Sequence, residues 1–96
     1  MPSIIWSQAA LRDTARLHAF LIENSPGAAQ RAIKTIRQAV RLLAAHPEVG
    51  RPMDGLALGF REWFVEFGQS GYLVLYHFDG NEVIILGVRH GREAGY

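Results

Sequence analysis

A basic cluster near the C-terminal end contains the residues whose types and spacing could do chemistry. It reads Arg89-His90-Gly91-Arg92 and directly follows the last apolar run of the chain. Arginine side chains bind phosphate or carboxylate groups bidentately, and histidine exchanges protons near neutral pH. Two interpretations of Arg89, His90 and Arg92 follow. They form either a site for a phosphate or an acidic partner, or ordinary charged surface at a strand end.

A second basic group lies between residues 24 and 47, a segment without any acidic residue. The group consists of Arg31, Lys34, Arg37 and Arg41. Nine of the ten basic residues of the chain are arginines, which favours planar contacts with carboxylates or phosphates. The group is either a solvated helix face or a surface for an acidic peptide or phosphates. The net charge of +1 is too small for the whole chain to act as a polycation.

Several other classes of site are excluded by composition and motif. The chain has no cysteine, which excludes disulfides, thiolate zinc sites and a cysteine nucleophile. His18 lies beside an apolar stripe and His77 at a strand end, and no spacing of histidines and carboxylates matches a metal site. Phosphate-binding glycine loops, dinucleotide-binding motifs and serine-hydrolase motifs are absent as well. The sequence therefore predicts no metal and no cofactor.

Length and hydropathy predict one small domain without a membrane segment. The 96 residues, 49% of them apolar, suffice for a single core, so residues 1–96 are assigned to one domain. No apolar run approaches the roughly 18 residues that span a bilayer. The N-terminus lacks the basic and then apolar pattern of a signal peptide. We therefore expect a cytoplasmic protein without membrane contact.

Two helices must position the second basic group. Ser7 and Ser25 occupy N-cap positions, and Pro26 suits the first turn of the second helix. Apolar residues recur every three or four positions through residues 8–23 and 26–46, as expected for amphipathic helices. The short break between them predicts an α-hairpin whose apolar stripe covers a sheet.

Three strands must position the C-terminal cluster. Apolar runs at residues 61–67, 72–78 and 83–88 alternate with turns that contain Gly, Asp or Asn, which predicts an antiparallel meander. An apolar, β-prone stretch at residues 4–6 predicts a first strand, whose partner the sequence does not indicate. The order is β-α-α-β-β-β. It predicts an α+β fold with the N-terminal strand and the helical hairpin packed on one face of a small antiparallel sheet.

The meander also determines where its basic residues lie. An antiparallel order reverses the chain twice, so Arg61 begins at one end of the sheet and Arg89 finishes at the other. The two arginines are therefore not expected to form one compact site. In the loop that precedes the meander, we expect Leu56 and Leu58 to point toward the core.

Three segments carry a resemblance to a known family. They are Gly50-Arg51-Pro52, Ser70-Gly71-Tyr72-Leu73-Val74-Leu75-Tyr76 and Val88-Arg89-His90-Gly91-Arg92-Glu93. In this order and spacing, and over nearly its full length, the chain resembles toxins of the RelE/ParE superfamily. These are the toxic partners of bacterial toxin–antitoxin pairs, and the resemblance implies their fold.

The superfamily divides by function, and three positions help to choose between its branches. Ribosome-dependent ribonucleases of the RelE branch carry basic residues on the first meander strand and an arginine just after the middle-strand tyrosine. In this sequence Phe64, Glu66 and Leu73 hold those places. An aromatic ring and a carboxylate do not stabilise the charge that develops on a reacting phosphate. The loss of this basic set is similar to the ParE branch.

The resemblance thus implies a non-enzymatic toxin that inhibits DNA gyrase by binding it. It also implies a cognate ParD-like antitoxin that silences the toxin in a hetero-oligomer. The partner-binding residues expected from the two basic groups are Arg31, Lys34, Arg37, Arg41, Arg89, His90 and Arg92. Two alternatives stay open. One is an mRNA endoribonuclease that uses Arg61, Arg89, His90, Arg92 and Tyr96 as phosphate clamp and acid/base groups. The other is a family member that has lost its toxicity.

Overall fold

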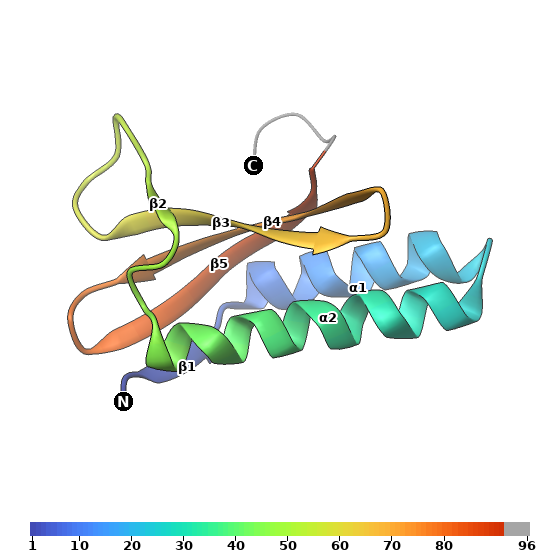
Figure 1. Cartoon of the computed structure of the whole chain (residues 1–96), viewed down its shortest axis with the longest axis horizontal. Coiled ribbons are helices and arrows are strands. Elements are labelled where there is room, and N and C mark those ends of the chain that lie inside the picture. The colour runs from blue at the N-terminus through green and yellow to red at the C-terminus, as the bar shows by residue number, and fades with distance from the viewer. Residues whose placement is uncertain (92–96) are drawn as a thin grey trace.

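Five strands and two helices make up residues 1–91, the part of the 96-residue chain that the computed structural model describes (Figure 1). In chain order they are β1 (Ser3–Trp6), α1 (Gln8–Ile22), α2 (Pro26–Ala45), β2 (Arg51–Pro52), β3 (Phe60–Phe67), β4 (Ser70–Phe78) and β5 (Glu82–His90). The strands form one sheet in the order β1-β5-β4-β3-β2, and both helices lie on one face of it. This is the α+β architecture expected from the sequence.

Side-chain caps fix where the two helices begin. The hydroxyl of Ser7 accepts a hydrogen bond from the backbone N–H of Ala10, and that of Ser25 accepts one from Ala28. Pro26 occupies the first turn of α2, where a missing N–H costs nothing. Both helix starts are therefore confirmed. Within residues 1–91, neither helix is long and apolar enough to cross a membrane.

The two edge strands differ from expectation. β1 pairs in parallel with β5, from Ser3 opposite Glu82 to Trp6 opposite Ile85, so the sheet is mixed rather than antiparallel throughout. The meander of β3, β4 and β5 is antiparallel, as predicted. At the other edge, residues 51–52 pair with β3 where only a rigid loop was expected. A proline is tolerated there because an edge strand needs no N–H on its outer side.

The core lies between the helices and the sheet. Its largest fully buried side chains are Tyr76, Ile36, Leu43, Ile85, Val40, Val74, Val83 and Val88. On β3, the side chains of Trp63, Val65 and Phe67 pack on this core, whereas Phe64 and Glu66 are exposed. Alternate residues of a strand point to opposite faces, so the second set marks the open face of the sheet.

A β-bulge in β5 is the point where α1 is fastened to the sheet. The register of β4 and β5 shifts between Leu75 and Tyr76, which leaves Leu86 as an extra residue in β5. The backbone N–H of Val88, just beyond the bulge, donates to Oδ2 of Asp13 at 2.9 Å. A helix side chain thus satisfies a backbone group beside the irregularity in the strand.

Tyr76 and Arg61 anchor the loop between α2 and β2 on the sheet. The hydroxyl of Tyr76 accepts a hydrogen bond from the N–H of Gly50 at 2.9 Å and donates to the carbonyl of Pro47 at 2.8 Å. The Nη1 atom of Arg61 donates to the carbonyls of Glu48 and Gly50 at 2.9 and 2.7 Å. Burial raises the pKa of Tyr76, so the phenol keeps the proton that it donates.

The prediction that Leu56 and Leu58 point toward the core is wrong. Leu58 is 96% exposed and Leu56 is 51% exposed. Their loop projects from the sheet between β2 and β3 (Figure 1). Gly55 and Gly59 have φ angles of 81° and 95°, which lets the backbone turn outward at both ends of this segment.

Candidate functional site

The basic cluster at the end of β5 is divided between the two faces of the sheet. Arg89 lies opposite Leu73 of β4, and His90 lies opposite Tyr72. Tyr72 belongs to the core between sheet and helices. Because successive residues of a strand point to opposite faces, His90 faces the helix layer and Arg89 faces the open side. The two side chains therefore do not act at one point.

His90 lines a cavity of about 600 Å³, with both aromatic and polar walls, between α1 and the β3–β4 hairpin. Arg16, Phe20, Phe67 and Tyr72 line the same cavity. The His90 ring packs edge-on against Tyr72, with 5.7 Å between the ring centroids. Burial raises the pKa of Tyr72, so its hydroxyl stays neutral at physiological pH. The surroundings of His90 are those of an aromatic packing contact.

The open face presents apolar and acidic side chains at the positions where the resemblance to a RelE-like nuclease would require cations. Phe64, Leu73 and Arg89 lie in one row across β3, β4 and β5. Phe64 is 49% exposed, and Glu66 is exposed two residues further along β3. Arg89 is the one cation in the row that these three residues form. Its Nε and Nη1 atoms are shielded from solvent.

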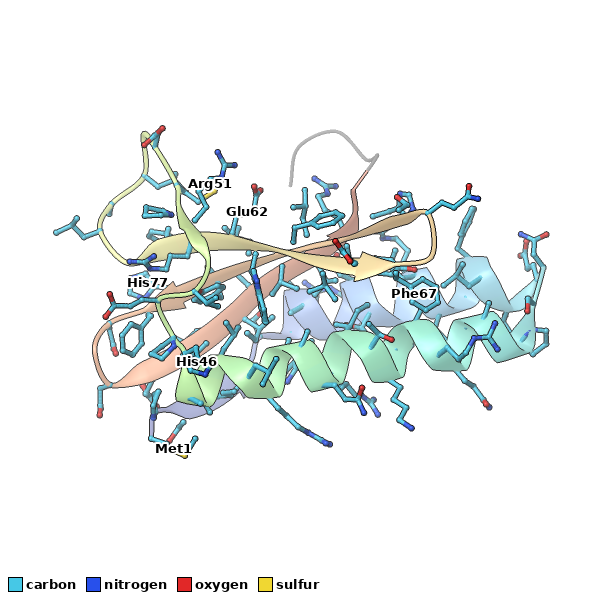
Figure 2. All side chains as sticks on the ribbon, in the orientation of Figure 1. Met1, His46, Arg51, Glu62, Phe67 and His77 are labelled. Atoms are coloured by element: carbon cyan, nitrogen blue, oxygen red, sulfur yellow. The ribbon has the colours of Figure 1, made fainter. Side chains whose placement is uncertain are left out.

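Arg51 and Glu62 add a salt bridge to the same face, with 2.7 Å between Nη2 and Oε1 (Figure 2). Arg51 is exposed, and the Glu62 side chain is largely buried. The pair links β2 to β3 at the edge of the sheet. This glutamate stands on the side of β3 that also carries Phe64 and Glu66. Acidic groups therefore accompany the aromatic ring along this strand.

Arg61 is separated from Arg89 both along and across the sheet. It lies opposite Tyr76, whereas Arg89 aligns with Phe64, three residues further along β3. At about 3.3 Å per residue this offset is about 10 Å along the strands, in addition to two strand spacings. The sequence prediction that the two do not form one compact site is confirmed. Arg92 and Tyr96 of the alternative nuclease set lie outside the described residues.

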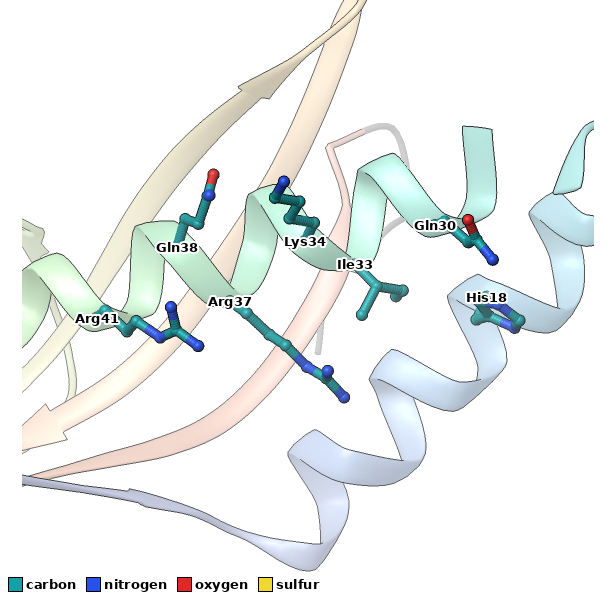
Figure 3. A pocket seen from close by; sticks show the side chains of 7 residues that line it. All are labelled: His18, Gln30, Ile33, Lys34, Arg37, Gln38 and Arg41. Atoms are coloured by element: carbon teal, nitrogen blue, oxygen red, sulfur yellow. The ribbon is translucent and has the colours of Figure 1, made fainter. Parts of the chain in front are cut away.

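The second basic group borders a groove between α1 and α2, on the side of the helices away from the sheet (Figure 3). Lys34, Arg37 and Arg41 line it, together with Ile33 of α2 and His18 of α1. Figure 3 shows the Arg37 side chain extending toward α1. The volume is about 460 Å³. Arg31 is exposed on α2 but does not line this groove.

The groove continues toward β1 over an apolar floor of about 510 Å³. Ile4 and Trp6 of β1 and Leu11 of α1 contribute to it, and Arg37 and Arg41 border both parts. No feature of the sequence indicated that β1 would lie here. The sequence indicated only weakly that Leu11 could belong to a contact surface. It lies beside the buried stripe of α1 rather than on the charged side.

No cluster of three or more histidine, aspartate or glutamate side chains within residues 1–91 converges on a possible metal position. The geometry instead offers three kinds of contact surface. They are a cationic groove with an apolar floor on the helices, an aromatic cavity at the hairpin, and an open sheet face with exposed Phe64. Each suits recognition of another molecule.

Comparison with known proteins places the chain in a family. The family described as "ParE toxin of type II toxin-antitoxin system, parDE" matches residues 4–95. Toxin RelE3 of Caulobacter vibrioides is 34% identical over 93 residues, covering 97% of this chain and 98% of that toxin. Toxin RelE1 of the same organism is 33% identical over 91 residues, covering 95% of each chain.

A solved structure described as the chromosomal ParDE TA system from P. aeruginosa shares the fold. Its TM-score is 0.75 at 24% identity, and the match covers 94% of this chain and 96% of that one. The family match extends over both helices and all of the sheet except Ser3. The chain therefore belongs to the ParE toxin family, within the RelE/ParE superfamily, and is the toxin of a type II toxin–antitoxin system.

Proposed function

We propose that this toxin acts by binding DNA gyrase and performs no chemistry of its own. The observation that carries the proposal is the row formed by Phe64, Leu73 and Arg89 on the open face of the sheet. Phosphoryl transfer requires several groups that stabilise developing negative charge at one point. This row supplies one cation beside an exposed aromatic ring, and Glu66 adds a negative charge nearby.

The placement of the other candidate nuclease residues supports the same conclusion. Arg61 donates to two loop carbonyls, so its guanidinium serves the structure of the loop. His90 points to the helix layer, away from the face on which Arg89 lies. A general acid or base must reach the same substrate atoms as the phosphate clamp. These three side chains do not meet that condition.

The partner that silences this toxin is proposed to be a ParD-like antitoxin, assembled with it into a hetero-oligomer. The similar P. aeruginosa structure is described as a ParDE system, which supports this assignment. The toxin surface provides apolar and cationic areas that such a partner would cover on binding. Both proteins would act in the cytoplasm, where gyrase works.

A supercoiling assay tests the proposed target. Purified toxin is added to gyrase, relaxed plasmid and ATP, and the products are separated with and without protein digestion. We expect loss of supercoiling together with accumulation of cleaved DNA. The same toxin after incubation with its antitoxin serves as the matched control and should leave gyrase active. Full supercoiling at a large excess of free toxin would rule out gyrase as the target.

A ribonuclease remains the second candidate because two relatives carry the name RelE. Toxin added to a translating extract, followed by primer extension on the message, would then produce new 5′ ends. We expect none. A third candidate, a member without toxicity, predicts normal growth when the chain is expressed without antitoxin. Growth arrest combined with intact message would exclude both alternatives.

A further inference from the structure

The cavity between α1 and the β3–β4 hairpin has the size of a small-molecule site. Its volume is about 600 Å³, and pockets that hold small ligands measure roughly 300–1,000 Å³. Its walls come from the second half of α1, from the hairpin and from the last residue of β5. It shares no lining residue with the groove between α1 and α2. The cavity is therefore a separate site on the helix side of the sheet.

Tyr72 brings a hydroxyl without a protein partner to this cavity. The residue is only 2% exposed, yet its hydroxyl makes no hydrogen bond to residues 1–91. The hydroxyl of Tyr76, on the same strand, has two such bonds. Buried tyrosine hydroxyls usually find a partner. Because Tyr72 lines the cavity, the partner of its hydroxyl must be water or a ligand inside it. Burial raises the pKa of Tyr72, so the hydroxyl keeps a proton to donate.

Aromatic rings follow one another along the walls of the cavity. The ring centroids of Phe67 and Tyr72 lie 5.9 Å apart, and those of Tyr72 and His90 lie 5.7 Å apart. Phe67 lies on the helix side of the hairpin (Figure 2). Phe20 of α1 adds a fourth ring, which is 67% exposed. Aromatic rings attract one another in tilted and edge-to-face arrangements. A flat ring in the cavity would make such contacts and would cover Phe20.

The polar groups of the cavity favour an anion over a cation. Arg16 lines it, and none of its described lining residues is acidic. A guanidinium group binds a carboxylate through two parallel hydrogen bonds. Gln69 and Ser70 add further hydrogen-bonding side chains from the hairpin. A ligand with a carboxylate would therefore meet complementary charge, whereas an amine would meet repulsion.

We propose that this cavity binds a small aromatic carboxylate. The ring of the ligand packs against Phe20 and Phe67, and its carboxylate accepts hydrogen bonds from Arg16 and from the hydroxyl of Tyr72. Each part of the ligand answers a feature of the walls, because a saturated ring would lose the aromatic contacts and an amine would lose the acceptor. The proposal does not depend on gyrase as the target.

A titration of the whole toxin with four small molecules tests this proposal. The probes are phenylacetate and indoleacetate, with one and two rings. Phenethylamine keeps the single ring but replaces the carboxylate by a cation, and cyclohexylacetate keeps the carboxylate but replaces the ring by a saturated one. A ligand that binds the folded protein raises its melting temperature as the ligand concentration increases. Amide shifts in ¹⁵N NMR spectra give the affinity and locate the site.

We expect both aromatic carboxylates to bind saturably and to shift the amides near Phe20, Gly68 and Tyr72. Phenethylamine should bind about tenfold more weakly or not at all, since a favourable charge contact becomes repulsive. Cyclohexylacetate should bind several-fold more weakly, because it keeps the charge and loses the ring contacts.

The polar contacts have matched variants. Tyr72→Phe keeps the ring and removes only the donor, and it should weaken binding of phenylacetate about tenfold, because hydrogen bonds to charged groups are the stronger ones. Arg16→Gln should weaken binding to a similar extent. Arg12→Gln makes the same change on α1 outside the cavity and should alter affinity less than about twofold.

The apolar wall has its own matched pair. Phe20 lines the cavity and Leu42 does not, and both are exposed, by 67% and 54%. Phe20→Ser should weaken binding several-fold, whereas Leu42→Ser should leave it unchanged. Melting curves without ligand show that each variant is folded before its affinity is compared.

Four results would overturn the proposal. They are the absence of saturable binding at millimolar concentrations, equal binding of phenylacetate and its two comparators, shifts confined to amides outside the cavity, and full affinity in Tyr72→Phe and Arg16→Gln together. The titration contains no gyrase, so its outcome is separate from that of the supercoiling assay. Ligand binding without gyrase inhibition would remove the proposed target and leave the ligand site. Gyrase inhibition without ligand binding would remove only the ligand site.

Discussion

Tyr76 shows how one buried side chain holds a loop that is distant in the sequence. Its hydroxyl accepts from Gly50 and donates to Pro47, so two backbone groups depend on one phenol. A Cβ atom added at Gly50 would lie 2.6 Å from the hydroxyl oxygen. Only glycine therefore leaves room for this approach. The contact gives a physical reason for the glycine in the Gly50-Arg51-Pro52 segment.

Replacing Tyr76 by Phe should lower the free energy of unfolding by about 1–3 kcal/mol, because the Gly50 N–H and the Pro47 carbonyl lose their partner. Tyr72→Phe is the matched control. Tyr72 is equally buried, and its hydroxyl makes no hydrogen bond to residues 1–91. Its removal should change stability much less. Urea unfolding of both variants measures the difference, and equal losses would contradict the role assigned to Tyr76.

At the scale of elements, α1 is held at its start and again where it crosses the bulge of β5. Ser7 caps the helix, and its own N–H extends the hydrogen bonding of β1 to Ile85. Asp13 reaches the sheet one and a half turns later. A helix tied to the strand at two points cannot slide along it. The Val88 N–H beside the bulge thus needs Asp13 as its acceptor, and the Asp13 carboxylate needs this N–H as a donor.

Asp13→Ala should destabilise the fold by about 1–3 kcal/mol, since the Val88 N–H loses its acceptor. Asp13→Asn keeps an oxygen in the same position and should lose less. Asp54→Ala, in the exposed loop after β2, provides the control with the same change of charge. Thermal melts rank the three variants, and hydrogen exchange at the Val88 amide locates the effect. Unchanged exchange in Asp13→Ala would refute this attachment.

Local signals made most of these elements predictable from the sequence. The caps at Ser7 and Ser25 and the proline at position 26 act within one turn of helix, so both helix starts were predicted. The alternation of β3 and the turns of the meander are equally local. The absence of cations at Phe64, Glu66 and Leu73 could also be read directly. These features require no knowledge of distant contacts.

Features that depend on distant partners could not be predicted. The parallel pairing of β1 joins residues about eighty positions apart. Gly87 inside β5 is a residue type that often marks a bulge, but the position of the register shift depends on the partner strand β4. The division of Arg89 and His90 between two faces follows from β5 continuing to His90, beyond the predicted end at Val88. The floor of the interhelical groove needs both β1 and α2 in place before Leu11 acquires a role.

At the scale of the whole molecule, the groove and the open sheet face lie on opposite sides. The helices cover one face of the sheet, and the groove is on their outer side (Figures 1 and 3). Phe64 projects from the other face, with the whole sheet between them. Two partners could therefore contact this small toxin without sharing residues.

This separation predicts that the two activities can be lost independently. Phe64→Ser removes the exposed ring of the open face and should weaken gyrase inhibition about tenfold, the usual loss for a central aromatic contact. It should leave binding of the antitoxin unchanged. Arg37→Glu should do the reverse. Leu42→Ser controls for loss of an exposed apolar side chain, because Leu42 is 54% exposed and Phe64 is 49% exposed. Parallel supercoiling assays and antitoxin titrations on these three folded variants give the comparison. If Phe64→Ser weakened both activities equally, or Leu42→Ser matched it in the gyrase assay, the open face would not be the separate target surface.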